Sequence, residues 1–236
     1  FTTETLERYK RDLGTLGYSA QYQQSPVPSG GGQFKKEWFR YFTQTHEAYL
    51  LETSRGVQSL FKNTCWLFVT VDLAISSKQS ADYTVFAIWA VTPERDLLLL
   101  EIVRAHFSNP DQLKQLRLGH MRYPGAYFKI EKVGYQLALI QQALSEGIPC
   151  TEYQPVRDKV TRASTAAIWM ENGKIYFLNG APWLHDVESE MLTFPMGAHD
   201  DIVDCISMAA EEVTSGRDIC ELDAETAKAI SGYVGY

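Results

Sequence analysis

Several features are scarce in this sequence of 236 residues, and each absence excludes a class of protein. No uninterrupted apolar run reaches the roughly 18 residues that a membrane-spanning helix needs, so we expect no membrane partner. The opening segment Phe1-Thr2-Thr3-Glu4 has neither a basic region nor an apolar core, which argues against a signal peptide. A chain that begins with Phe1 rather than Met is interpreted as a fragment or a processed product.

Cysteine motifs and nucleophile motifs are also missing. The four cysteines, at positions 65, 150, 205 and 220, form no C-x-x-C pair, so neither a zinc site nor a redox motif is indicated. We interpret them as reduced, mostly buried thiols of a cytosol-like compartment. No Walker A sequence and no G-x-S-x-G elbow occurs, which excludes a P-loop ATPase and makes a serine hydrolase improbable.

The composition that remains is that of a globular protein, with 45% hydrophobic and 22% charged residues. The net charge of −7 argues mildly against nucleic acid, but its distribution matters more than its sum. Residues 1–42 carry +2 and residues 209–236 carry −4, which leaves −5 for the part between them. An acidic core is either a solvated surface or a set of carboxylates that requires divalent cations.

The chain divides near residues 25–33, where Ser25-Pro-Val-Pro-Ser-Gly-Gly-Gly32 can continue neither a helix nor a central strand. We therefore predict a mostly helical segment and linker over 1–33, a main domain over 34–214, and a flexible acidic tail over 215–236.

Hydrophobic periodicity in the main domain predicts an α/β fold. Three consecutive strands joined by short connections favour antiparallel pairing, and helices then alternate with further strands. We expect a mixed sheet flanked by helices, with strands over 66–73, 83–91, 97–105, 126–131, 150–156 and 174–178, and helices over 109–123, 134–146, 158–172, 183–192 and 199–213.

Carboxylates at the ends of these elements are the main chemical signal. Asp72 ends the most apolar strand and Glu131 ends another, whereas Asp200, Asp201 and Asp204 begin the last helix. Each has a plain structural explanation, since Asp72 could cap a turn and acids are stabilised at a helix N-terminus. Together they can converge if the two strands are parallel neighbours. Such a cluster selects hard cations, Mg²⁺ or Mn²⁺, and suits two-metal phosphodiester hydrolysis.

Two sets of segments carry a resemblance to a known family. Residues 18–39, Tyr18-Ser-Ala-Gln-Tyr22-Gln-Gln-Ser-Pro-Val-Pro-Ser-Gly-Gly-Gly-Gln-Phe34-Lys-Lys-Glu-Trp38-Phe, resemble the stretch that joins the ATPase and nuclease domains of tailed-phage terminase large subunits. The rest is similar to their C-terminal nuclease through Val71-Asp72, Asp82-Tyr83, Ile130-Glu131, Lys159-Val-Thr-Arg162-Ala, Glu190 to Phe194-Pro195, and His199-Asp-Asp-Ile-Val-Asp204. The ordered set is specific, and it covers nearly the whole chain except the tail.

The resemblance implies an RNase H-like fold in which the first and fourth strands of the main pattern are parallel neighbours. It implies metal-dependent cleavage of concatemeric double-stranded DNA during phage or prophage genome packaging, with two Mg²⁺ or Mn²⁺ ions. Residues 1–33 would be the end of the ATPase domain and a linker. The catalytic and metal-ligating residues would be Asp72, Glu131, Asp200 and Asp201, and within the last pair Asp200 is our first choice.

Further roles follow from the same resemblance and from charge. Asp82, Asp204 and His199 would support the metal site from outside the ligand set. Arg157, Lys159, Arg162 and Lys132 would contact DNA phosphates, although a solvated helix face explains the first three equally simply. The expected partners are double-stranded DNA, the ATPase domain, the portal protein and the small terminase subunit, in the host bacterial cytoplasm and transiently at the procapsid portal.

Two other interpretations remain open. The chain could be another RNase H-like nuclease, of the resolvase or transposase type, which a preference for junction substrates would reveal. It could also be a non-catalytic module that docks on DNA or the portal, with acids that serve only structure; absence of Mn²⁺ binding would indicate this.

Overall fold

The computed structural model describes residues 4–5, 7–9, 11–14, 32–74, 83–132 and 136–215. The described residues between 4 and 14 are helical, as the sequence predicted. Asp82, most of the predicted linker and almost all of the predicted tail lie outside the described residues, so these predictions remain as they stand.

The strands form one mixed sheet with the order β3-β2-β1-β9-β6-β5-β4-β7-β8. Their bounds are β1 (Arg40–Gln44), β2 (Ala48–Thr53), β3 (Gly56–Phe61), β4 (Trp66–Asp72), β5 (Thr84–Val91), β6 (Leu97–Ala105), β7 (Tyr127–Glu131), β8 (Cys150–Tyr153) and β9 (Ile175–Leu178).

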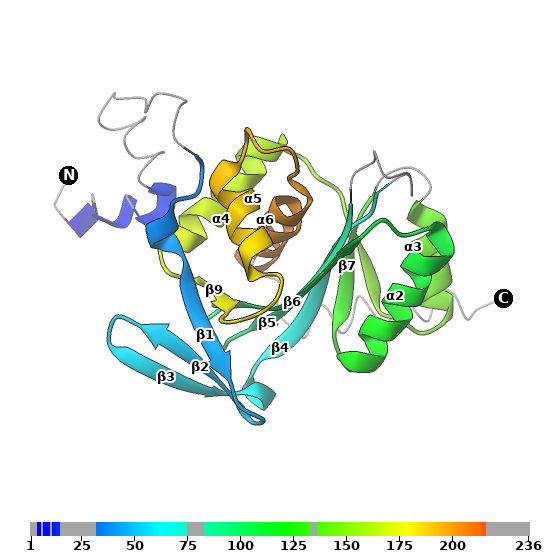
Figure 1. The fold of residues 1–236 in the computed structure, drawn as a ribbon, viewed down its shortest axis with the longest axis horizontal. Coiled ribbons are helices and arrows are strands. Elements are labelled where there is room, and N and C mark those ends of the chain that lie inside the picture. The colour runs from blue at the N-terminus through cyan, green and yellow to red at the C-terminus, as the bar shows by residue number, and fades with distance from the viewer. Residues whose placement is uncertain are drawn as a thin grey trace.

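Helices cover both faces of this sheet, as Figure 1 shows. One face carries α4 (Lys159–Glu171), α5 (Leu184–Thr193) and α6 (Asp201–Thr214), and the other carries α2 (Asn109–Arg122) and α3 (Gln136–Ser145). Two short 3-10 turns, η1 (Lys36–Trp38) and η2 (Lys62–Thr64), flank the first three strands. Because side chains alternate along each strand, the sheet supplies two separate apolar layers, one beneath each group of helices.

The predicted pairing is confirmed in the centre of the sheet. Strands β4, β5 and β6 are antiparallel, and β4 pairs in parallel with β7, which pairs in parallel with β8. Several predicted boundaries are off by one to three residues; β8, for instance, ends at Tyr153 rather than at Val156. The order of elements therefore could be obtained from local patterns, whereas exact ends could not.

Strands β1, β2 and β3 were not predicted. They extend the sheet beyond β9, which is parallel both to β6 and to β1 (Figure 1). The edge strand β3 is exposed along nearly its whole length, so it lacks the apolar alternation that marks a strand with one buried face. Its pairing with β2 follows the turn at Gly56, where φ is +112° and a side chain would strain the backbone.

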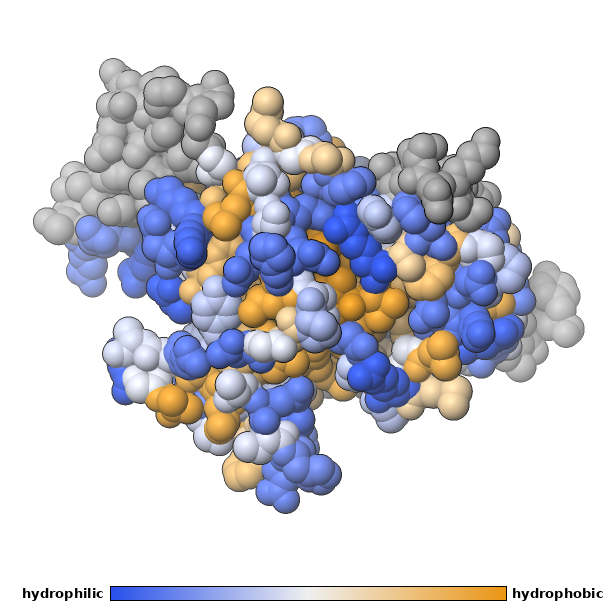
Figure 2. Space-filling model, viewed as in Figure 1, coloured by the Kyte–Doolittle hydropathy of each residue, from blue (hydrophilic) through white to orange (hydrophobic). Residues whose placement is uncertain are grey.

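Hydrophobic side chains also reach the surface. Figure 2 shows them gathered in a hollow near the middle of the displayed face, with hydrophilic residues around it. Among the described residues no helix is both long and apolar enough to cross a membrane.

Candidate functional site

The register of the sheet brings charged residues into one row. Val71 in β4 is level with Ile130 in β7, so the next residues, Asp72 and Glu131, end two neighbouring parallel strands. On the other side Asp72 pairs with Val85, which pairs with Arg104 in β6. Residues paired across a sheet share a face. The end of the sheet thus presents Glu131, Asp72 and Arg104 towards the side that α6 covers.

Helix α6 adds further carboxylates above this row. Asp201 and Asp204 lie in its first turn, and their side chains are almost entirely buried. Asp200 occupies the N-cap position but makes no capping hydrogen bond, and 42% of its side chain is exposed. The sequence therefore predicted the acidic helix start correctly, while the structure turns Asp201 and Asp204 inwards and leaves Asp200 at the rim.

The carboxylates interact strongly. Burial raises the pKa of Asp72 well above its usual value, and the charges of Asp204, Glu131 and Asp201 raise it further. Burial likewise raises the pKa of Glu131 and of Asp204, although nearby cations oppose this. Four carboxylates from β4, β7 and α6 thus lie near enough to repel one another, an arrangement that requires positive charge.

Two cations from α4 supply part of that charge. The Lys159 ammonium lies 2.6 Å from Asp200 Oδ1 and 2.6 Å from Asp204 Oδ2. Arg162 is buried; its Nη2 lies 3.2 Å from Asp204 Oδ1, and its Nη1 lies 3.9 Å from Glu131 Oε1. Asp158 caps α4 by accepting from the Thr161 amide at 3.0 Å, which fixes the turn that carries Lys159.

A third cation, Arg104, connects the row to α5 and α6. Its Nη1 lies 3.2 Å from Glu190 Oε2, and its Nη2 donates to Asp201 Oδ2 at 3.2 Å. The other Glu190 oxygen accepts from the amides of Ile202 and Val203 at 2.7 and 3.1 Å. A side chain from α5 therefore satisfies donors at the N-terminus of α6 that have no partner within the helix.

Aromatic rings continue this network towards the surface. The Arg104 guanidinium lies 4.2 Å from the centre of the Tyr83 ring. Tyr83 stacks on His106 with ring centres 4.1 Å apart and meets the exposed His199 edge-on at 5.2 Å. His199, predicted as a supporting residue, thus lies one ring away from the arginine that holds Asp201.

The four predicted DNA contacts are placed differently from one another. Lys159 and Arg162 point into the carboxylate cluster, and Lys132 is exposed but pairs with Glu152 at 2.6 Å. Arg157 is exposed and lines an open groove of about 630 Å³ between β8 and the C-terminal end of α6. Arg157 therefore lies apart from the carboxylate cluster, exposed at an open groove.

The residues fit a hard divalent cation by their chemistry. Asp72, Glu131, Asp201 and Asp204 offer only oxygen donors, which Mg²⁺ and Mn²⁺ prefer. Their present arrangement is not a ready-made cage, since within the ranges that the structure describes no three His, Cys, Asp or Glu side chains form a group that could hold a metal. The acids instead pair with Lys159, Arg162 and Arg104.

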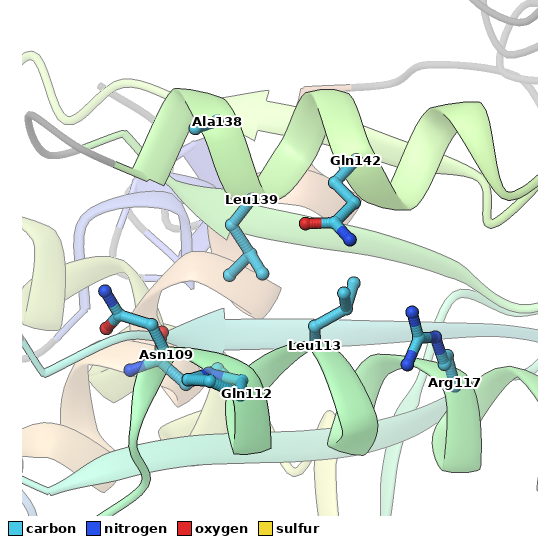
Figure 3. Close-up of a pocket in the computed structure, with 8 residues that line it drawn as sticks. Asn109, Gln112, Leu113, Arg117, Ala138, Leu139 and Gln142 are labelled. Atoms are coloured by element: carbon cyan, nitrogen blue, oxygen red, sulfur yellow. The ribbon is translucent and has the colours of Figure 1, made fainter.

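A cavity on the opposite face of the sheet lacks this chemistry. Figure 3 shows a cavity of about 480 Å³ between α2 and α3, where Leu113 and Leu139 face each other. No acidic residue lines it, and its helices cover the sheet face opposite to α6. The candidate site is therefore the carboxylate cluster and not this cavity.

Two residues of this site were missed as functional candidates from the sequence. Arg104 stands near the end of an apolar strand, and Glu190 begins one of the segments that carry the family resemblance. In the sequence, each could have been noticed as a charged residue at a position where burial is otherwise expected. The sequence could not show that Arg104 and Glu190 pair with each other, because β6 and α5 are distant along the chain.

Comparison with known proteins identifies the family of this chain. The sequence profile described as the terminase RNaseH-like domain matches residues 69–212, a range that contains all the described carboxylates of the cluster. The chain belongs to the terminase RNaseH-like domain family. A search of curated proteins gave no match.

Solved structures with the same fold are terminase nucleases. The large terminase nuclease of thermophilic phage G20c, with bound magnesium, has a TM-score of 0.56 at 17% identity, over 78% of this chain and 99% of that one. The Thermus phage P74-26 large terminase nuclease domain has a TM-score of 0.50 at 17% identity, over 73% and 90%. The predicted RNase H-like fold is thereby confirmed.

A longer relative shares the fold over part of its length. The large terminase of another thermophilic bacteriophage has a TM-score of 0.63 at 10% identity, over 91% of this chain. The match takes up 53% of that protein, so this terminase domain spans about half its length.

Proposed function

We propose that this terminase domain is a metal-dependent endonuclease that cuts concatemeric double-stranded DNA during phage genome packaging. The observation that carries the proposal is the convergence of Asp72, Glu131, Asp201 and Asp204 at one end of the sheet. These acids come from a strand pair and a helix far apart in sequence, and burying them together is costly unless a cation compensates.

Asp72, Glu131, Asp201 and Asp204 are the residues that would hold divalent ions. Asp204, which the sequence placed outside the ligand set, is added because its buried carboxylate lies near enough to Asp72 to raise the pKa of Asp72. Magnesium or manganese bound there would activate water and stabilise the leaving oxygen of a phosphodiester. The G20c nuclease was crystallised with magnesium, zinc and cobalt, which supports a divalent ion at the corresponding place in this chain. The inward placement of Asp201 favours it over Asp200 as a ligand, contrary to our first choice from the sequence.

The remaining residues orient the acids and the substrate. Arg104 and Glu190 fix the start of α6, and with it the direction of Asp201. Arg157, exposed beside β8, is the proposed contact to backbone phosphate, which positions DNA without reading its sequence. Few such contacts are available in an acidic chain, so we expect weak and nonspecific cutting by this domain alone.

The wider assembly is proposed from a longer relative and, for the portal protein, the small subunit and the compartment, from the family resemblance of the sequence. The longer large terminase, of which our chain matches about half, was also crystallised with ADP and with ATP-gamma-S. We propose that an ATPase domain precedes this domain in the full protein, which acts with the portal protein and the small subunit in the host bacterial cytoplasm.

Conversion of supercoiled plasmid in Mn²⁺ tests the activity. We expect nicking and linearisation by the native protein, and none by Asp72→Asn, because the amide keeps the shape of the side chain but removes a ligand charge. Thermal denaturation should show that Asp72→Asn folds as well as the native protein. Unchanged nicking by the purified variant contradicts the role of Asp72. An inert native protein that also binds no Mn²⁺ in calorimetry would favour a docking module.

A further inference from the structure

We propose that Lys159 is an internal competitor of the divalent cation, since its ammonium neutralises Asp200 and Asp204 in the metal-free protein and leaves Asp204 when a metal ion binds. The inference rests on the proposed function, because it assigns a second role to the same carboxylates. If it is correct, the metal affinity of the domain depends on Lys159 in α4 as well as on the carboxylates.

The contacts of Lys159 carry this inference. Its ammonium lies 2.6 Å from an oxygen of each of two aspartates, and one of these, Asp204, is almost completely buried beside Asp72. Asp204 is therefore already satisfied by a cation, which a metal ion has to replace at that oxygen.

Lys159 can move away from Asp204, whereas Arg162 cannot. About one third of the Lys159 side chain is exposed, it stands in the first turn of α4, and its four-carbon stem reorients easily. Arg162 is 6% exposed and lies within 4 Å of both Asp204 and Glu131. Its guanidinium is enclosed by the fold and already placed between two buried carboxylates, so Arg162 has little room to move.

A released lysine needs another anion. Lys159 and Asp200 form the exposed part of the cluster, with 33% and 42% of their side chains exposed, so we expect a phosphodiester to reach the acids there. A phosphate that pairs with Lys159 stabilises the form in which Asp204 is free for metal. Coupling free energies are reciprocal, so DNA should strengthen metal binding by the same factor by which metal strengthens DNA binding.

Calorimetry with Mn²⁺ alone tests the competition. We expect Lys159→Met to lower the Kd for Mn²⁺ by roughly tenfold, a coupling of ordinary size. Lys159→Arg, which keeps the charge, should stay near the native value. Lys174→Met is the matched control, because Lys174 forms an equally short pair with Asp96 at the other end of the sheet; its Kd should not change.

Two further measurements separate a direct contact from a general field effect. The difference between Lys159→Met and the native protein should persist at 0.5 M NaCl, roughly where a long-range field is screened. Urea unfolding in EDTA should show that the metal-free form of Lys159→Met is the less stable one, and that added Mn²⁺ raises its midpoint more than it raises the native midpoint.

The coupling to DNA is measured by repeating the titration with a non-hydrolysable phosphorothioate duplex present. Native protein should bind Mn²⁺ more tightly with the duplex, and Lys159→Met should show no such gain. An equal or weaker Mn²⁺ affinity of Lys159→Met without DNA overturns the inference while leaving the nuclease intact. No Mn²⁺ binding and no nicking by the native protein overturns the proposed function itself, so the two failures are distinguishable.

Discussion

At the level of single residues, Arg162 is the counter-charge that allows Glu131 and Asp204 to be buried together. It reaches Asp204 at 3.2 Å and Glu131 at 3.9 Å, and all three residues are buried. A buried ion pair adds little to stability compared with an apolar pair, but the removal of one partner leaves an uncompensated charge. Arg162 is thus needed by the fold independently of any contact with DNA.

We expect Arg162→Met to lower the free energy of unfolding by about 3 kcal/mol or more, because two buried carboxylates lose their nearest guanidinium. Urea denaturation in EDTA measures the effect. Arg117→Met is the control, since Arg117 pairs with Glu146 on the surface and its loss should hardly move the midpoint. Equal midpoints for Arg162→Met and the native protein contradict the prediction.

A second residue-level prediction concerns pH. Burial, together with a 2.7 Å hydrogen bond that it donates to Glu188, raises the pKa of Tyr41 to about 12. An unfolded tyrosine ionises near pH 10. The folded state therefore holds the proton more tightly, and the resulting stability is complete below pH 10 and is lost as the pH rises towards 12.

The test compares native protein with Tyr41→Phe. We expect the urea midpoint of the native protein to fall more steeply between pH 9 and pH 11 than that of Tyr41→Phe. Burial also raises the pKa of Tyr49 to about 12. Because Tyr49 is present in both proteins, its effect on the pH dependence cancels in the comparison. Parallel pH profiles would show that the hydrogen bond between Tyr41 and Glu188 does not hold this proton.

At the level of elements, α6 is the part whose placement decides the site. Its N-terminus is held by Glu190, and its middle by Thr70, whose hydroxyl donates to the Cys205 carbonyl at 3.0 Å. Near its C-terminus, Glu212 pairs with the buried Lys129 of β7 and accepts from the Tyr127 hydroxyl at 3.0 Å. These three sets of polar contacts along a nearly buried helix fix its rotation about its axis, so that Asp201 and Asp204 face the sheet.

The contacts of Glu190 at the N-terminus of α6 can be tested with two substitutions. Glu190→Gln keeps an oxygen for the Ile202 and Val203 amides but loses the charge that faces Arg104, whereas Glu190→Leu loses both. We expect Glu190→Leu to cost about 2 kcal/mol or more, because it removes a helix cap and leaves Arg104 without one of its partners. Glu190→Gln should cost less.

Metal binding distinguishes positioning from plain stability. If Glu190 sets the direction of Asp201, the Kd for Mn²⁺ should rise in the order native, Glu190→Gln, Glu190→Leu, even at temperatures where all three are folded. Identical affinities in the three folded proteins would assign Glu190 a purely structural role.

At the level of the whole molecule, β1 connects the residues that precede β4 to the main sheet. It pairs with β9, and Phe39 packs against Phe177 with ring centres 5.2 Å apart. The Gln33 side chain donates to the Val160 carbonyl and to the Ser164 hydroxyl, both at 2.9 Å. The residues before β4 thus contribute to the core under α4 and α5, although the family profile begins only at residue 69.

A truncated chain should reveal this dependence. We expect residues 62–215 to melt at a lower temperature than residues 33–215 and to aggregate, because loss of β1 turns β9 into an exposed edge strand. Differential scanning calorimetry and size-exclusion chromatography measure both effects. Two species with the same melting temperature would mean that β1, β2 and β3 are a peripheral addition.

Local sequence patterns were enough for the centre of this fold. The apolar run that forms β4 and the alternation of strands with capped helices depend on neighbours in sequence, so β4 to β8 and their order could be predicted. The same patterns placed acids at the ends of β4 and β7 and at the start of α6. Strand β3 escaped prediction because a strand exposed on both faces carries no apolar period.

The sequence by itself therefore determined the kind of sheet and the acids that end its strands, because burial leaves its period in neighbouring residues. Only the tertiary structure decided which cations meet those acids. Arg104 comes from β6, and Lys159 and Arg162 come from α4. An ion pair requires that side chains from such distant segments arrive within about 4 Å of each other. No local pattern encodes that distance, which the packing of α4, α5 and α6 on the sheet sets.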